Sequence, residues 1–262
     1  MTKTILLTGA TDGIGLETAR ALAGEGHRLL LHGRNPDKLA AVADELGGAA
    51  TFEADLGDLG AVARMADAVV DAGETIHVLI NNAGVYKARD PRAANGMDLR
   101  FIVNTVAPYL LTKRLLPVMG EGGRVVNLSS AAQAPVRLAQ LTDGATRMAD
   151  MEAYAQSKRA ISLWSAAMDA QTQGIAIMSV NPGSLLASKM VKEGFGVAGN
   201  DLGIGVDILR RMALSEEFAD AGGRYWDNDN GRFAPVAPEG GADGAELIAA
   251  MDAIIAQATG SA

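Results

Sequence analysis

The fold of this chain is decided by the stretch Thr8-Gly9-Ala10-Thr11-Asp12-Gly13-Ile14-Gly15. It joins a short apolar run, residues 4–8, to an amphipathic segment, residues 14–24, as a turn joins a strand to a helix. Its glycines have the spacing G-x-x-x-G-x-G, which permits a tight turn and a close approach of the backbone to another group. Backbone amides at the start of the helix can then face an anion such as a pyrophosphate. A purely structural turn is the alternative, since a glycine turn alone is a weak motif.

Short apolar runs of strand length alternate with longer amphipathic segments. The runs lack strict polar–apolar alternation, as strands buried on both faces do, and they cover residues 4–8, 28–32, 50–52, 78–81, 124–128 and 175–181. The helix-like segments cover residues 14–24, 36–46, 59–72, 97–119 and 151–171. This order predicts one α/β domain, residues 1–262, with a parallel sheet between layers of helices. Ligands then bind at the carboxyl ends of the strands.

Composition argues against several classes of protein. Of the 262 residues, 48% are hydrophobic, which indicates a packed globule, and the net charge of -8 argues against a nucleic-acid partner. Without cysteine the chain has no disulfide and no thiolate metal site, and the three histidines show no ligand spacing, so we expect no metal. No stretch approaches the ~18 apolar residues of a membrane span. Residues 1–8 do not resemble a signal peptide, and we expect a cytoplasmic protein.

Tyr154 and Lys158 form the most informative pair of side chains. They lie four residues apart in a helix-like segment, so the phenol and the ammonium group share one face. A tyrosine with a pKa near ~10 is a poor base at neutral pH, and a neighbouring cation lowers that pKa. The pair therefore suits general acid–base catalysis, in which the tyrosine exchanges a proton with a substrate oxygen. The same spacing also arises by chance, so the pair needs support from other motifs.

Together with three other motifs, this pair resembles the short-chain dehydrogenase/reductase family. That family carries T-G-x-x-x-G-x-G after the first strand, N-N-A-G after the fourth, Y-x-x-x-K on a helix and P-G after the sixth. After the glycine turn, the chain shows these motifs as Asn81-Asn82-Ala83-Gly84, Tyr154 with Lys158, and Pro182-Gly183. The resemblance extends to Gly223-Arg224-Tyr225-Trp226, which we expect to contain the last strand. It implies a three-layer, Rossmann-like, doubly wound fold with a seven-stranded parallel sheet.

Further features are similar to the retinol-dehydrogenase-like branch of that family. They are Gly33-Arg34-Asn35, Leu110-Leu111-Thr112 and the separation of 23 residues between Ser130 and Tyr154. The branch says little about the substrate, which the sequence leaves open together with the preferred direction of reaction.

The resemblance implies a role for each of four residues. Tyr154 exchanges a proton with an alcohol or carbonyl oxygen, and Lys158 binds the cofactor ribose and lowers the pKa of the phenol. Ser130 orients the substrate oxygen; the alternative is that Ser129 and Ser130 both have structural roles at the strand end. Asn104 holds a water that links Lys158 to solvent. These roles predict an oxidoreductase that transfers a hydride between a nicotinamide cofactor and a small alcohol, aldehyde or ketone.

The resemblance also assigns the cofactor-binding residues. They are Gly9, Thr11, Asp12, Gly13, Ile14, Gly15, Arg34, Asp55, Leu56, Asn82, Ala83, Gly84, Tyr154, Lys158, Pro182 and Gly183. Enzymes selective for NAD usually place a carboxylate at the end of the second strand, where it accepts hydrogen bonds from the ribose 2′-hydroxyl group. Here Arg34 follows that strand, and a guanidinium group pairs with the 2′-phosphate of NADP. We therefore expect NADP, with NAD as the alternative cofactor and a solvated Arg34 as the alternative role.

Several features remain open to more than one interpretation. Residues 131–150 and 184–243 are the least regular, and we expect them on the substrate side, with an apolar lid or a packed helix pair between residues 185 and 212. Ser184 or Ser188 stands near the place where many family members have a threonine beside the carboxamide. Residues 227–231 resemble the start of a calcium loop, but Pro238 occupies the position where such loops have glutamate. We expect His32 in solvent at a strand end, with an approach to the adenosine as the alternative.

Three other functions compete with the oxidoreductase. A dinucleotide sensor without turnover predicts an incomplete set of catalytic residues, whereas Asn104, Ser130, Tyr154 and Lys158 are all present. A scaffold offers no reason for the glycine turn, and family members that reduce an activated C=C bond use a wider Tyr–Lys spacing. Family members commonly pair through the helices that carry Asn104 and Tyr154, so a homodimer or homotetramer is expected.

Overall fold

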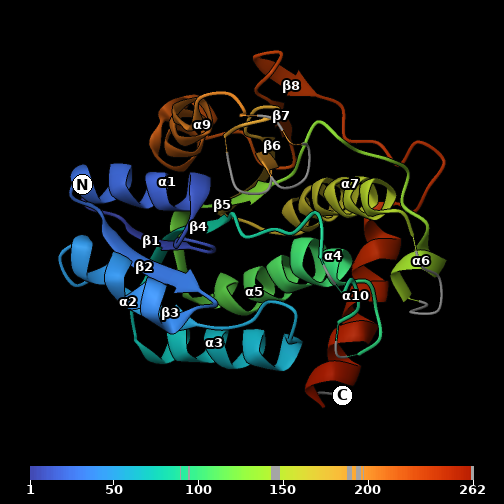
Figure 1. Ribbon diagram of the computed structural model, residues 1–262, viewed down its shortest axis with the longest axis horizontal. Coiled ribbons are helices and arrows are strands. Elements are labelled where there is room, and N and C mark those ends of the chain that lie inside the picture. The colour runs from blue at the N-terminus through green and yellow to red at the C-terminus, as the bar shows by residue number, and fades with distance from the viewer. Residues whose placement is uncertain are drawn as a thin grey trace.

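The fold is an open sheet between two layers of helices (Figure 1). The computed structural model describes residues 1–88, 90–93, 95–142, 148–187, 191–192, 196 and 198–260. The strands lie in the order β3-β2-β1-β4-β5-β6-β7-β8, and the first seven are parallel to one another. Their bounds are β1 Thr4–Leu7, β2 Arg28–Gly33, β3 Ala50–Glu53, β4 Ile76–Asn81, β5 Met119–Leu128, β6 Ile175–Asn181, β7 Tyr225–Asp227 and β8 Arg232–Ala234. The predicted Rossmann-like class is confirmed.

In the described part of the chain the sheet has eight strands rather than the predicted seven. The extra strand, β8, pairs antiparallel with β7 and closes a hairpin at the edge of the sheet. It escapes prediction because three residues, Arg232–Ala234, are too short to show a periodic pattern. β5 also begins at Met119, five residues before the predicted start at residue 124, because the glycines in its first half resemble a turn.

The helices divide between the two faces of the sheet (Figure 1). One face carries α1 (Gly13–Gly24), α2 (Pro36–Glu45) and α9 (Leu202–Leu214). The other carries α3 (Leu59–Asp71), α5 (Ala107–Leu115) and α7 (Asp150–Asp169), with α10 (Gly244–Thr259) against α7 and α3. The shorter helices are α4 (Leu99–Phe101), α6 (Leu138–Thr142), η2 (Leu116–Val118) and η3 (Glu216–Phe218). Each face has its own apolar core, and the buried strands separate the two.

Aspartate and asparagine residues begin many of these helices. In each case the side-chain oxygen accepts a hydrogen bond from a backbone N–H of the first turn, which satisfies a donor that lacks a partner within the helix. The capping residues are Asp12, Asn35, Asp58, Asp98, Asp201 and Asp243. The sequence therefore specifies these helix starts locally.

The predicted helix over residues 97–119 is wrong in one respect, because the structure divides it. Between α4 and α5 lies η1 (Ile102–Val106), a wider turn of π-helix that contains Asn104. Pro108 follows four residues later and has no N–H to donate to the carbonyl of Asn104. Turns of this kind inside helices are frequent at functional sites.

The carboxyl ends of the central strands bring the sequence motifs to one edge of the sheet. The glycine turn follows β1, Asn82 follows β4, Ser130 follows β5 and Pro182 follows β6. Because these four strands are adjacent and parallel, the motifs that follow them lie beside one another.

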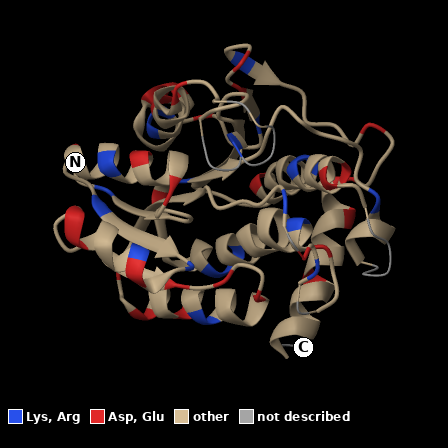
Figure 2. Cartoon of the chain, viewed as in Figure 1, with Lys and Arg blue, Asp and Glu red and all other residues tan. Residues whose placement is uncertain are grey.

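The outer surface shows charged residues of both signs interspersed over the helices (Figure 2). No helix in the described part of the chain is long and apolar enough to cross a membrane. Residues 202–214, within the segment where the sequence allows a lid or a packed helix, form α9, which packs against α1.

Candidate active site

The glycine turn is packed so closely that it excludes side chains. Gly9 has a φ of 67°, in the left-handed region that favours glycine. A Cβ on Gly15 would lie 2.2 Å from the carbonyl oxygen of Gly9 and 2.4 Å from Nδ2 of Asn82. Asp12 caps α1, its Oδ1 accepting from the N–H of Gly13 at 2.8 Å. The turn and the first residues of α1 therefore form one compact unit.

Hydrogen bonds join this turn to the segment after β4. Nδ2 of Asn82 donates to the carbonyl oxygens of Thr8 (2.9 Å) and Gly9 (3.1 Å). Oγ1 of Thr8 accepts from the N–H groups of Asn82 (3.0 Å) and Ala83 (3.1 Å). Two motifs about 70 residues apart in the sequence thus hold each other in place.

His32 forms a hydrogen bond with the glycine turn. The expectation that it lies in solvent is wrong. It is only 2% exposed. Its Nδ1 accepts from the N–H of Gly9 at 3.2 Å, so the proton is on Nε2, which lies 3.1 Å from the carbonyl oxygen of Ala54. Burial lowers the pKa of His32, so the ring is neutral near pH 7. Through these hydrogen bonds the ring, which lies on β2, links the residues that follow β1 and β3. No local sequence pattern predicts this role.

The end of β2 carries positive charge beside the turn. A Cβ on Gly33 would lie 2.7 Å from Cγ2 of Thr11, so this strand end touches the glycine turn. Arg34 and Lys38 are exposed, and within the described residues neither side chain forms an ion pair. Asp55, after β3, is also exposed and accepts from the N–H of Gly57 at 2.9 Å. The arrangement leaves cationic groups available to an anion next to the turn.

Lys158 reaches from α7 to the end of β5. Its Nζ donates to the carbonyl oxygen of Leu128 at 2.7 Å and lies 5.7 Å from the centre of the Tyr154 ring. A Cβ on Gly84 would lie 3.4 Å from this Nζ and 3.3 Å from Oδ1 of Asn104. Burial lowers the pKa of Lys158 to about 8. The ammonium group, Asn104 and Gly84 therefore lie together.

Tyr154 lies beside Ser130 and against a second tyrosine. The ring of Tyr86 meets that of Tyr154 edge-on, with centres 5.2 Å apart. Burial is the largest influence and raises the pKa of Tyr154, a hydrogen bond with Ser130 acts to lower it, and Tyr86 acts to raise it. The net direction is opposite to the one predicted from the Tyr–Lys spacing, because loss of hydration disfavours the phenolate more than the hydrogen bond favours it. Tyr154 is therefore a neutral phenol near pH 7.

The two serines at the end of β5 have different surroundings. Oγ of Ser129 donates to the carbonyl oxygen of Lys158 at 2.6 Å and accepts from Oγ of Ser162 at 2.9 Å. Ser129 is buried and its hydroxyl group is engaged in holding β5 to α7. The hydroxyl group of Ser130 instead meets the phenol of Tyr154. Of the two, Ser130 is the one placed beside Tyr154.

Asn104 braces three segments around Lys158. Its Oδ1 accepts from the N–H of Val85 at 2.8 Å, and its Nδ2 donates to the carbonyl oxygen of Val85 at 2.9 Å and to Oγ of Ser157 at 3.0 Å. The side chain is fully buried. Because its amide group is occupied in this way, Asn104 fixes η1 to α7 and to the segment that follows β4.

The loop after β6 is the last of the four segments that lie at the carboxyl ends of the central strands. Gly183 has a φ of 132°, and Ser184 donates from its backbone N–H to Asp229 at 2.8 Å and also from its hydroxyl group. The hydroxyl group of Ser184 thus already has a partner. Ser188, the other serine considered for this region, lies outside the described residues.

Comparison with known proteins identifies the family. The model of the short chain dehydrogenase family matches residues 3–195. The chain belongs to the short-chain dehydrogenase family. Human retinol dehydrogenase 13 is 28% identical over 251 residues, 86% of this chain and 76% of that protein. Mouse retinol dehydrogenase 12 is 33% identical over 197 residues, 71% of this chain and 62% of that protein. These similarities confirm the retinol-dehydrogenase-like branch.

A solved structure shows the same arrangement. The crystal structure of a short-chain dehydrogenase from Escherichia coli complexed with NADPH superposes with a TM-score of 0.69 at 25% identity, covering 86% of this chain and 96% of that one. Together with the family match, this makes the chain an oxidoreductase of the short-chain dehydrogenase type.

Four residues of this short-chain dehydrogenase were not predicted as parts of the site. Tyr86 follows the N-N-A-G motif by two residues and forms an aromatic wall beside Tyr154. His32, Tyr225 and Asp229 reach the site from elsewhere in the fold. The sequence signal was weak for each, since aromatic and acidic residues occur throughout the chain. Asp229 lies in the stretch that resembles a calcium loop, and that resemblance does not indicate its contact with Ser184.

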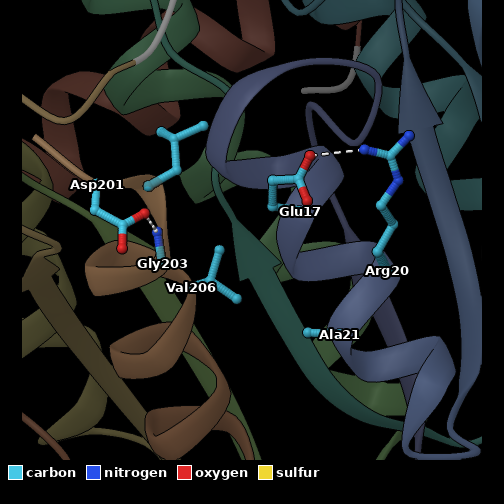
Figure 3. A pocket seen from close by; sticks show the side chains of 7 residues that line it. Glu17, Arg20, Ala21, Asp201, Gly203 and Val206 are labelled. Carbon is cyan, nitrogen blue, oxygen red and sulfur yellow. Dashed lines mark hydrogen bonds and ion pairs between the residues drawn. The ribbon is translucent and has the colours of Figure 1, made fainter. Parts of the chain in front are cut away.

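A surface hollow of about 620 Å³ lies between α1 and α9, and none of the residues assigned to the active site lines it (Figure 3). Its charged groups have partners within the chain: Arg20 pairs with Glu17 and Glu45, and Asp201 accepts from the N–H of Gly203. No group of three or more potential metal-ligating side chains occurs within the described ranges.

Proposed function

We propose that this short-chain dehydrogenase transfers a hydride between NADP and the carbonyl or alcohol carbon of a small molecule. The observation that carries the proposal is the grouping of Ser130, Tyr154 and Lys158 at the same sheet edge as the glycine turn. A phenol, a hydroxyl group and an ammonium group together suit proton transfer to an oxygen atom. An aldehyde, a ketone or an alcohol supplies that oxygen.

The residues at the sheet edge fit a dinucleotide. Close packing at Gly9 and Gly15 leaves backbone rather than side chains facing the space above the turn, where α1 begins. Arg34 and Lys38 offer charge to a 2′-phosphate, and no carboxylate of the described residues neutralises them. Asp55 and Leu56 would contact the adenine, and Pro182 and Gly183 the nicotinamide. When bound, the nicotinamide ring supplies or accepts the hydride.

The chain's own residues hold the substrate and move the proton. With its pKa raised, Tyr154 is protonated near neutral pH and can donate its proton to a carbonyl oxygen as charge develops there. Ser130, hydrogen-bonded to the same phenol, can donate to that oxygen and orient it. Lys158 holds the ribose and stabilises the phenolate once the proton has left. Asn104 keeps Lys158 in place and takes part in returning the proton from solvent.

The first test is the substitution Tyr154→Phe, which removes the proton donor and keeps the ring. We expect turnover of aldehydes or ketones with NADPH to fall by about 10²–10⁴-fold, the usual contribution of general acid catalysis. NADPH binding, measured by fluorescence, should be retained. Tyr109→Phe is the matched control, because it removes a buried phenol hydroxyl group that binds Asp252. Comparable turnover in wild type and Tyr154→Phe would refute the assignment.

The second test concerns the cofactor. Arg34→Ala should weaken NADPH binding by roughly 10- to 100-fold, as expected for loss of a charge-assisted hydrogen bond, and leave NADH binding almost unchanged. Arg64→Ala on α3, an exposed arginine with a long ion pair to Asp58 at 3.8 Å, is the control. An unchanged ratio of the two affinities in Arg34→Ala would rule out a role for Arg34 in selecting NADP.

The setting of the enzyme follows from the same reasoning. We propose a cytoplasmic location, small-molecule partners only, and a homodimer or homotetramer, the last by analogy with the family. The size and shape of the substrate depend on residues 184–243, a region that includes residues outside the described ranges.

A further inference from the structure

The β7–β8 hairpin ends in a turn that lies against the loop after β6. The turn comprises residues 227–231, and the loop comprises residues 181–184. The hairpin lies beyond residues 3–195, the part that the family model matches.

Asp229 makes the central contacts between turn and loop. Its carboxylate accepts hydrogen bonds from the backbone N–H of Ser184 at 2.8 Å, from Nδ2 of Asn181 at 2.8 Å and from Oγ of Ser184. Burial alone would raise the pKa of Asp229, but the bonds from Ser184 and Asn181 lower it overall. The group is thus ionised near neutral pH, and hydrogen bonds to a charged acceptor are the stronger kind.

Neighbouring residues of the turn reinforce these contacts. Nδ2 of Asn228 donates to the carbonyl oxygen of Pro182 at 3.1 Å. Asp227 accepts from Nδ2 of Asn181 at 3.2 Å and from the backbone N–H of Asp229 at 3.2 Å. The turn is therefore fixed internally as well as bonded to the loop.

The loop has a backbone that depends on such support. Gly183 has a φ of 132°, and Leu185 has a φ of 52° although it is not glycine. A bulky residue adopts this conformation only where its surroundings hold it there. Asn200 also supports the loop, donating from Nδ2 to the carbonyl oxygen of Ser184 at 2.9 Å.

The other end of the hairpin contacts the segment that carries Ser130. Oη of Tyr225 donates to the carbonyl oxygen of Ser130 at 3.0 Å, and Nε2 of Gln133 donates to the same oxygen at 3.0 Å. Tyr225 is 7% exposed and packs at the start of β7. One hairpin therefore touches both the serine segment and the loop after β6.

We propose that the β7–β8 hairpin fixes the loop over the nicotinamide relative to Ser130, with Asp229 as the positioning residue. The proposal rests on the proposed function, which places Pro182 and Gly183 against the nicotinamide. It predicts that Asp229 affects the nicotinamide end of the cofactor and not the adenosine end.

The experiment compares two ligands and three variants. NADPH carries the nicotinamide, whereas adenosine 2′,5′-bisphosphate carries the adenosine and the 2′-phosphate without it. Asp229→Ala should weaken NADPH binding by about tenfold or more, since several charge-assisted hydrogen bonds are lost, with the affinity for the bisphosphate unchanged. Ser184→Ala, which keeps the backbone bond to Asp229, should have a smaller effect in the same direction. Asp220→Ala is the control, because this exposed carboxylate has no hydrogen bond or ion pair among the described residues.

Amide hydrogen exchange gives a readout without any cofactor. The Ser184 amide should exchange faster in Asp229→Ala than in wild type and Asp220→Ala, while the amides of the glycine turn should not change. Unchanged exchange at Ser184, or an equal loss of affinity for both ligands, would overturn the proposal. Wild-type protein that binds neither ligand would instead contradict the proposed function, and the exchange result would still decide whether Asp229 holds the loop.

Discussion

At the scale of single residues, Lys158 shows how burial sets the chemistry of the site. The residue is only 4% exposed, and its ammonium group has one described hydrogen-bond partner, the carbonyl oxygen of Leu128. Loss of hydration lowers its pKa to about 8, from an ordinary value of 10.5. Tyr154, a few ångströms away, has its pKa raised by the same cause. Burial thus moves the two pKa values apart, that of Lys158 downwards and that of Tyr154 upwards, because it disfavours the charged form of each group.

The shift of Lys158 predicts a dependence of stability on pH. Below pH 8 the folded protein must bury the charged form, whereas between pH 8 and 10.5 the unfolded chain holds a proton that the folded chain has released. The free energy of unfolding of wild type, relative to Lys158→Met, should therefore rise with pH across this window, by on the order of 3 kcal/mol at most. Urea unfolding of both proteins at about pH 7 and about pH 10 measures this difference. A difference that falls with pH would show that the charged form is favoured in the fold.

At the scale of elements, the start of α1 depends on contacts with its neighbours. The helix itself is specified locally by the cap at Asp12 and by glycines that end it. Its position against the turn, however, depends on Gly15, where the carbonyl oxygen of Gly9 and the amide of Asn82 fill the space that a side chain would need. The same residue type therefore has a different meaning at each end of the helix.

Two glycine substitutions in α1 test this difference. Gly15→Ala should destabilise the protein by about 1–3 kcal/mol, because backbone atoms of the turn must move, and should reduce cofactor affinity. Gly24→Ala is the matched control, since no atom lies within 4 Å of its added Cβ. Alanine has the higher helix propensity, so this variant should be neutral or more stable by up to ~1 kcal/mol. Thermal unfolding and NADPH titration measure both effects. Equal behaviour of the two variants would show that the turn tolerates a side chain.

At the scale of the whole molecule, α10 covers the helices through which family members commonly pair. Every residue of α7 except Met151 is buried or half-buried, and in α5 the exposed residue is Lys113. Leu247, Met251 and Ile254 of α10 belong to the core on this face. Asp252 accepts from Oη of Tyr109 at 2.9 Å and from Nζ of Lys113 at 2.8 Å. α10 is therefore part of the packed core on this face of the sheet.

Truncation tests the role of α10. A chain that ends at residue 243 exposes the apolar surface of α7 and should melt at a lower temperature and self-associate more than the full chain, since large exposed apolar patches promote association. A chain that ends at Thr259 keeps all of α10 and is the control. Light scattering at matched concentrations and thermal unfolding measure the two effects. A chain without α10 that keeps the mass and melting temperature of the full chain would show that α10 is not part of the core.

The sequence by itself determined the parts of this protein that are encoded locally. Strands buried on both faces, helix caps and the glycine turn depend on residues within a few positions of one another, and so does the pairing of Tyr154 with Lys158. From these features the fold class followed, whereas the expectation that Asn104, Ser130, Tyr154 and Lys158 meet came from the resemblance to the short-chain dehydrogenase/reductase family. The division of the helix at Asn104, and the short strand β8, exceeded what periodicity can show.

Only the tertiary structure decided how these residues are held and charged. His32 and Asp229 act on backbone groups 23 and 45 residues away, and α10 covers helices that precede it by some 100 residues. The raised pKa of Tyr154 likewise depends on burial, which arises from the whole packed edge of the sheet. Local patterns indicate which secondary structure each segment favours. The hydration of a side chain, its protonation and its hydrogen bonds depend on segments that meet only after folding.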